Sequence, residues 1–176
     1  MNAQVQCIDV DKLLEAIVFV ATKVPEPTLH KISKMFWYAD KLHLERYGFV
    51  LSADTYHAFP DGPVPSLIYD ILKIAKGLKQ FVPGVDADSV REALSVQADG
   101  RTVQSSRAPN IDYLSETEIE CLLDAMAAHG HKSFGTLSRE THDAAWSSVP
   151  RNAPIPLRAI VDTLPNAEEV ATLLYS

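Results

Sequence analysis

The segment 29–47 constrains the fold more than any other, because its apolar residues recur at the spacing of an amphipathic helix. Thr28 is a favourable N-cap residue, and Gly48 is a common residue just past a helix end. Asp40 and His43 are three positions apart, so their side chains can point into the same space. We therefore expect one long central helix around which the chain is organised. Its buried face would carry Ile32, Met35, Phe36, Ala39 and Leu42.

Three lysines lie on the other side of this helix: Lys31, Lys34 and Lys41. They could form a basic patch for an acidic partner. Polar residues on one helix face are more often simply exposed to water. We therefore predict a solvated helix face.

Hydrophobic periodicity predicts six further helices. One of them has a clear start, because Ser115 and Glu118 have the spacing of a capping box, and it should end near Gly130. Pro25 and Pro27 separate the first helix from the central one. Together, the predicted helices span 10–24, 29–47, 66–79, 115–130, 136–148, 157–164 and 167–175.

Two segments rich in turn residues predict different structures. In 91–107, Asp99-Gly100 lies between short apolar runs and favours a type I′ turn in an antiparallel hairpin. In Gly62-Pro63-Val64-Pro65, the prolines fix φ and lack a backbone donor, so we predict a rigid turn outside regular structure. The preceding loop, 49–59, should contain at most a short strand. The expected fold class is mainly α, a single compact helical domain of five to seven helices with a small antiparallel β-hairpin.

The length and charge of the chain limit its class. Its 176 residues suffice for one domain with a sizeable core. The net charge is −7, and the whole excess lies in 81–176, which holds 14 acidic and 7 basic residues. An acidic carboxy-terminal half argues against wrapping nucleic acid. It would suit a basic partner, or simply keep the protein in solution.

The chain carries no recognisable membrane or secretion signal. No apolar run reaches the ~18 residues of a membrane span. The start, MNAQVQCID, lacks the basic and apolar regions of a signal peptide. Cys7 and Cys121 are isolated, with neither metal-site spacing nor a disulfide framework. We therefore expect a cytoplasmic protein.

A second group of polar residues lies in the predicted helix 136–148. Ser138, His142 and Trp146 are spaced four apart and would form one line on that helix. This helix and the central helix thus both carry polar residues beside apolar surface. We expect the two sets to meet.

Taken in order along the chain, these motifs resemble the SocA-like antitoxin domain, also called Panacea or DUF4065. The resemblance runs from about Val10 to about Val149. It implies a family domain at 1–150, followed at 151–176 by a proline-rich connector and short helices that pack on it. The matching residues are Phe36-Trp37-Tyr38-Ala39-Asp40, His43, Tyr47-Gly48, Asp54, Tyr56, Ala58, Gly62-Pro63-Val64, Leu137-Ser138, His142 and Trp146.

This resemblance implies a function. Proteins similar to this one neutralise a co-encoded toxin by direct binding, and the SocA type is also a proteolytic adaptor that delivers its toxin to the ClpXP protease. The expected partners are therefore a cognate toxin and ClpX or ClpXP, without nucleic acid or membrane. No enzymatic activity, cofactor or metal is expected.

We interpret the motif residues as structural. A buried polar group without a partner costs about 1–3 kcal/mol. Asp40, His43, Ser138 and His142 would therefore satisfy one another and lock the two helices together, with Trp146 packed in the same core. The full set of positions expected to be structural is Asp40, His43, Gly48, Asp54, Tyr56, Gly62, Pro63, Val64, Ser138, His142 and Trp146.

An enzyme is the alternative. Asp40, His43 and His142 could form a 2-His-1-carboxylate metal site, and Ser138 could join them in a hydrolytic Ser-His-Asp site. No G-x-S-x-G elbow, H-E-x-x-H motif, P-loop or dinucleotide fingerprint accompanies them. A DNA-binding autoregulator is a third hypothesis, and the acidic balance argues against it.

Overall fold

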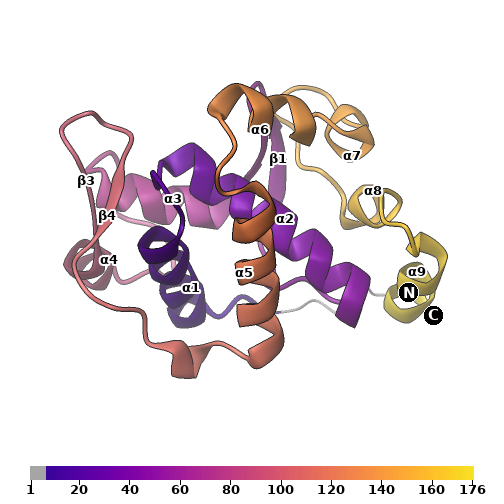
Figure 1. Cartoon of the computed structure of the whole chain (residues 1–176), viewed down its shortest axis with the longest axis horizontal. Coiled ribbons are helices and arrows are strands. Elements are labelled where there is room, and N and C mark those ends of the chain that lie inside the picture. The colour runs from indigo at the N-terminus through magenta and orange to yellow at the C-terminus, as the bar shows by residue number, and fades with distance from the viewer. Residues whose placement is uncertain (1–6) are drawn as a thin grey trace.

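The computed structural model describes residues 7–176 and is mainly α-helical, as predicted (Figure 1). Residues 1–6, on which part of the signal-peptide prediction rests, lie outside this range. The described residues form nine α-helices and two two-stranded antiparallel sheets, more than the predicted five to seven helices and one hairpin. In chain order the elements are α1 (Val10–Lys23), α2 (Leu29–Tyr47), β1 (Tyr56–Phe59), β2 (Gly62–Pro65), α3 (Ser66–Ala75), α4 (Ala87–Ala93), β3 (Leu94–Val96), β4 (Val103–Ser105), the 3-10 helix η1 (Ile111–Tyr113), α5 (Glu116–His129), α6 (Phe134–Thr141), α7 (Ala144–Ser147), α8 (Leu157–Val161) and α9 (Ala167–Tyr175).

Three of the longer helices begin at capping residues, among them the predicted Thr28 and Ser115. The side chains of Asp9 and Thr28 each accept a backbone N–H of the first turn, and they start α1 and α2. Gly48 ends α2 in the left-handed region, with φ 80°. Ser115 and Glu118 form both bonds of the predicted capping box at the start of α5. Local side-chain chemistry therefore sets these boundaries.

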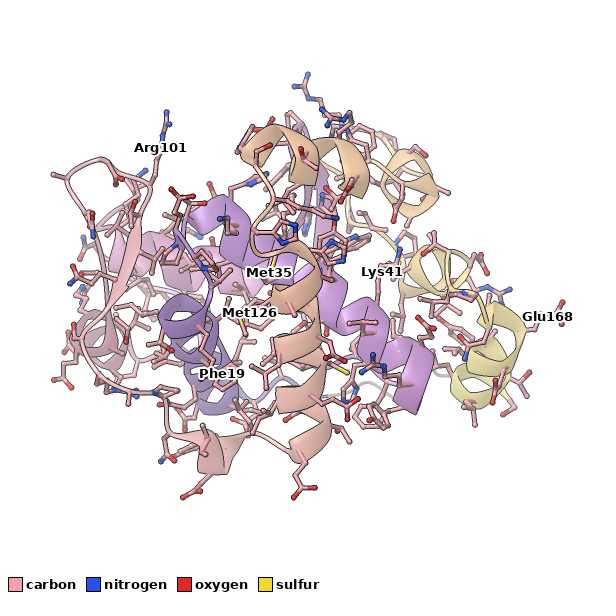
Figure 2. The ribbon with its side chains drawn as sticks, in the orientation of Figure 1. Phe19, Met35, Lys41, Arg101, Met126 and Glu168 are labelled. Carbon is pink, nitrogen blue, oxygen red and sulfur yellow. The ribbon has the colours of Figure 1, made fainter. Side chains whose placement is uncertain are left out.

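Two hydrophobic clusters enclose α2. The larger cluster joins α2 to α1, α3, α4, α5 and the β3–β4 sheet, and Met35 and Met126 lie where α2 and α5 cross (Figure 2). The smaller cluster packs Trp37 and Leu44 of α2 against β1, α7, α8 and α9. A helix covered from several sides has little room for a solvated face.

The segment Gly62-Pro63-Val64-Pro65 is a strand, and the prediction that it lies outside regular structure is wrong. β2 pairs antiparallel with β1, with Pro63 opposite Ala58 and Pro65 opposite Tyr56. Ala58 and Tyr56 direct backbone groups away from β2, because Ala58 N–H donates to Ala153 (2.9 Å) and Tyr56 C=O accepts from Ile155 (2.7 Å). The missing N–H groups of the two prolines therefore cost the ladder no bond.

The hairpin predicted for 91–107 begins later than expected. Residues up to Ala93 belong to the unpredicted helix α4, which Asp86 caps, and β3 pairs with β4 only from Leu94 onward. Asp99 is not among the residues with positive φ, whereas a type I′ turn requires positive φ at both central positions, so the predicted turn type is wrong. The Asp99 carboxylate instead accepts from Arg101 N–H (2.8 Å) and Thr102 N–H (2.9 Å).

The helix predicted for 136–148 is two helices. α6 ends at Thr141, and Asp143 starts α7 by accepting the N–H of Trp146 at 3.0 Å. His142 between them has ψ 56°, outside the helical region. The predicted single line of Ser138, His142 and Trp146 therefore does not form. This break and the unpredicted α4 explain why the chain has more helices than expected.

The chain after Pro150 returns along α2. Residues 152–155 run beside the free edge of β1, and Asn152 N–H donates to Ala58 C=O at 2.8 Å. α8 and α9 then follow beside the carboxy-terminal half of α2 (Figure 1). Their residues Ile160, Val161 and Val170 belong to the smaller cluster. Within residues 7–176, no helix is both long and apolar enough to span a membrane.

Candidate functional site

The side chain of Asp40, in α2, is the centre of a buried hydrogen-bond network that includes Tyr56, the first residue of β1. Its carboxylate accepts from Ser52 N–H (2.8 Å), Ser52 Oγ (2.5 Å) and Tyr56 Oη (2.6 Å). Burial raises the pKa of Asp40, and the hydrogen bonds from Ser52 and Tyr56 oppose that rise. Burial and the neighbouring Asp40 raise the pKa of Tyr56 as well, so the phenol stays a donor. The network fixes the loop after α2 to the helix itself.

Asp54 performs a capping role for a distant helix. Its carboxylate accepts from Leu67 N–H (3.0 Å) and Ile68 N–H (2.9 Å), the free donors at the start of α3. Pro65 precedes that helix and offers no side-chain cap, so Asp54 supplies the missing acceptor. Burial raises the pKa of Asp54, and the backbone donors counteract this.

His43 joins α2 to two other segments. Its Nδ1 donates to Phe49 C=O at 2.8 Å, and its Nε2 lies 3.1 Å from Thr117 Oγ1 on α5. Because a carbonyl can only accept, Nδ1 carries a proton. The imidazole is wholly buried and closes the junction between α2, α5 and the loop that follows Gly48.

The β1–β2 turn is held by four side chains that each donate to a different backbone carbonyl. Trp146 Nε1 donates to Phe59 (2.8 Å), His142 Nε2 to Pro60 (3.0 Å), His30 Nε2 to Asp61 (3.4 Å) and Lys34 Nζ to Pro63 (2.8 Å). We call these four donors, His30, Lys34, His142 and Trp146, the turn clamp. Stacking supports it, because the His142 and Trp146 rings lie 3.9 Å apart.

Gly62 is required where the turn clamp closes. Its φ is 107°, which side chains rarely adopt. A Cβ at this position would collide with Thr141 Oγ1 and would lie 2.7 Å from Lys34 Nζ. The Gly62-Pro63-Val64 motif and the His142/Trp146 motif therefore serve the same piece of structure.

Lys34 contradicts the predicted solvated face of α2. Its side chain is 0 % exposed, Lys31 is 7 % exposed, and Lys41 alone of the three is partly accessible. Burial lowers the pKa of Lys34 to about 7, although the Asp61 carboxylate raises it in part. Burial and the nearby Lys34 likewise lower the pKa of His30 to about 4.

The predicted mutual network of Asp40, His43, Ser138 and His142 does not form. Asp40 bonds to Ser52 and Tyr56, and His43 bonds across to α5. His142 is exposed at the turn, while the Ser138 carbonyl accepts from Thr141 within α6. The same separation leaves the proposed 2-His-1-carboxylate set unassembled. Among residues 7–176, no group of three or more His, Cys, Asp or Glu side chains is placed to hold a metal ion.

Sequence reasoning missed three participants: Ser52, Lys34 and His30. Ser52 lies in a loop without periodicity, so nothing in the sequence indicates its bond to Asp40. Lys34 did have a signal, because Trp37 stands one helical turn further on, in the middle of the supposed polar face. A large apolar residue there indicates that this face is covered too.

A cavity of about 210 Å³ lies between α2, the loop after it and the carboxy-terminal segment. Trp37, Tyr56 and Ile155 contribute to its walls. Its two carboxylates, Asp40 and Asp54, already accept the hydrogen bonds described above. The cavity therefore adjoins the structural network.

Comparison with known proteins identifies the family of this chain. The family model described as "Antitoxin SocA-like, Panacea domain" matches residues 32–147, which is well over half of the chain. The chain belongs to this family of SocA-like antitoxin domains. The matched range includes the Asp40 network, Asp54, the β1–β2 turn and three of the four clamp residues. No curated protein and no solved structure matches the chain significantly.

Proposed function

We propose that this protein is the antitoxin of a toxin–antitoxin pair and neutralises a co-encoded toxin by direct protein–protein binding in the cytoplasm. The observation that carries the proposal is the family match over 32–147. It is supported by the roles of the motif residues, because Asp40, His43, Asp54, His142 and Trp146 all bond within the fold. The exposed side chains would then carry the function, as they do in a protein that acts as a binding scaffold.

A second step follows from the SocA type of this family. We include in the proposal that the protein delivers its bound toxin to the ClpXP protease as an adaptor. The acidic carboxy-terminal half disfavours nucleic acid as a partner, and it leaves proteins as the expected partners. In this scheme the protein performs no catalysis of its own and needs no cofactor.

Co-expression with the product of the adjacent gene tests the binding step. The expected result is restored growth together with recovery of the two proteins as a stoichiometric complex from a tagged pull-down. Rescue of growth without physical association would contradict neutralisation by binding.

A separate measurement tests the adaptor step. In cells with ClpXP, the toxin should disappear within minutes when the antitoxin is present, and it should persist in cells that lack ClpX. A toxin lifetime that is the same in both strains would remove the adaptor role and leave direct binding intact.

A further inference from the structure

The tip of the β1–β2 turn is a preorganised surface. The turn clamp engages the carbonyls of Phe59, Pro60, Asp61 and Pro63, so the backbone there has few alternative conformations. A partner that binds a segment already held in place loses less conformational entropy on association. The exposed residues of the tip are Pro60 and Asp61.

Neither edge of this sheet can accept another strand. Residues 152–155 already occupy the outer edge of β1. On the outer edge of β2, Pro63 and Pro65 have no N–H, and the Pro63 carbonyl accepts from Lys34. Strand addition needs free backbone donors and acceptors. A partner at this turn must therefore contact side chains.

Two exposed residues contact the same imidazole beside the tip, Phe134 through its ring and Asp61 through its backbone carbonyl. The Phe134 ring at the start of α6 is 55 % exposed and lies 4.1 Å from the His30 ring. His30 Nε2 bonds to the Asp61 carbonyl on its other side. The next residue, Gly135, has open space within 4 Å of where a Cβ would be.

The carboxylate of Asp61 is free to bind a partner. Among residues 7–176 it takes part in none of the ion pairs or side-chain hydrogen bonds, although Lys34 is close enough to interact with it through space. Lys34 does not neutralise it by contact, because its ammonium is buried and donates to Pro63. A negative charge and an aromatic face thus stand at one corner.

We propose that Asp61 and Phe134 form a docking point for an arginine side chain of the toxin, an inference that rests on the proposed antitoxin function. A guanidinium is planar and always charged, so it can stack on the Phe134 ring while it bonds a carboxylate with two N–H groups. A lysine offers only a point charge. The net charge of −7 also favours approach of a basic partner surface.

The test measures the affinity of the purified protein for the toxin recovered from the pull-down. Asp61→Asn and Phe134→Ala should each weaken binding about tenfold, the range of an interface anchor. Asp61→Asn should also flatten the salt dependence of binding, because it removes the charge contact. Phe134→Ala should mainly speed dissociation.

Matched controls remove the same chemistry elsewhere on the surface. Asp112→Asn deletes another exposed carboxylate, and Phe81→Ala deletes an aromatic ring that is 74 % exposed. Both should leave the affinity unchanged. Unfolding curves of all four variants establish that each one folds as the unaltered protein does.

The outcomes separate the two proposals. If the unaltered protein does not bind the toxin, the proposed function fails. If it binds and both Asp61→Asn and Phe134→Ala bind equally well, the docking inference alone is overturned.

Two further results bear on the occupant. An Arg→Lys scan of the toxin should find one position whose loss of affinity disappears in the Asp61→Asn background, as a double-mutant cycle requires. If no arginine shows this coupling, the proposal that an arginine of the toxin binds at this corner is wrong. Self-association of the free protein that Phe134→Ala abolishes would assign the corner to a second copy of this chain and would also overturn the inference.

Discussion

The two β-hairpins of this protein are held in different ways. The side-chain contacts of the β3–β4 turn are local, because the Asp99 carboxylate bonds only to residues two and three positions further along the chain. The backbone that follows it also pairs with the loop before α2, where Leu29 N–H donates to Arg101 C=O at 3.1 Å and Pro27 C=O accepts from Val103 N–H at 2.6 Å. The β1–β2 turn is stabilised from outside, by donors on α2 and by His142 and Trp146, which lie more than 80 residues away from it. The side chain that holds the β3–β4 turn thus belongs to the turn itself, whereas the side chains that hold the β1–β2 turn reach it only when the helices have assembled.

The difference shows where the family motifs act. Gly62, Pro63, His142 and Trp146 all belong to the motif set, and all of them meet at the β1–β2 turn. None of the motif positions lies in the β3–β4 hairpin. The motifs therefore mark the turn that is held by side chains from distant segments.

The largest effect should come from closing the space at Gly62. We expect Gly62→Ala to lower the free energy of unfolding by about 4 kcal/mol, since the new Cβ collides with Thr141 and the φ of 107° is strained for alanine. Urea unfolding measures this. Gly84→Ala is the matched control, because Gly84 also has positive φ but open space around it, and about 1 kcal/mol is expected there. Equal losses at the two positions would contradict the steric argument.

The next effect concerns the buried lysine of the turn clamp. The pKa of Lys34 is about 7 in the folded protein because of burial, against an ordinary value of 10.5. Between these pH values the unfolded chain binds the proton and the folded chain does not, so this group makes the protein more stable as pH rises. Below pH 7 both states bind the proton, and the contribution no longer changes.

Lys34→Met should remove this pH dependence. Relative to the variant, the unaltered protein should gain on the order of 3 kcal/mol of unfolding free energy between pH 7 and pH 10. Urea unfolding at several pH values provides the comparison. Lys76→Met, at an exposed lysine, should keep the same pH slope as the unaltered protein. If the unfolding free energy of Lys34→Met changed with pH as that of the unaltered protein does, Lys34 would not have the lowered pKa of a buried lysine.

A smaller effect is expected from removing one donor of the turn clamp. Trp146→Phe keeps an aromatic ring beside His142 but leaves the Phe59 carbonyl without its donor. A loss of about 1 kcal/mol in unfolding free energy follows from one unmade hydrogen bond. Amide exchange should quicken in β1 and stay unchanged in β3. Faster exchange in both hairpins alike would remove the distinction between them.

The smallest effect should come from the β3–β4 turn, whose side-chain contacts are local. Hydrogen bonds from Thr102 and Arg101 lower the pKa of Asp99 to about 2, so its contribution is complete above the ordinary pKa of 3.8 and is lost as pH falls toward 2. Because the carboxylate is exposed, Asp99→Ala should lower the melting temperature only slightly. Amide exchange should rise at Arg101 and Thr102 alone. Destabilisation that spreads to β1 would show that the two hairpins are coupled.

The sequence predicted those features that depend on neighbouring residues. Helix starts at Thr28 and Ser115 follow from capping side chains within three positions, and the stripe of Ile32, Met35 and Phe36 follows from helical spacing. Such signals are contained in short windows, so a single chain suffices to detect them.

The features that it did not predict depend on distant residues. Pro63 can belong to a strand because its register opposite Ala58 requires no N–H from it, and residues 152–155 bond the backbone groups that Ala58 directs to the other side. Lys34 can be buried because a carbonyl of β2 accepts its ammonium. The predicted partners of Asp40 and His43 are wrong for the same reason. The observed partners are Ser52 and Thr117, and no pattern in the sequence indicates that they lie near these two residues. The residue types indicated that the polar side chains of Asp40 and His43 need hydrogen-bond partners, but they did not indicate which residues these partners are.

Residues 152–155, which run beside β1 like a third strand of the β1–β2 sheet, bear on how far the chain can be shortened. It lies beyond residue 147, where the family match ends, yet it covers the N–H of Ala58 and the carbonyls of Tyr56 and Ala58. A chain cut at residue 147 would present these groups as an open β edge, which invites pairing between molecules and aggregation. The stretch that defines the family is thus shorter than the stretch that covers both edges of its own β-sheet.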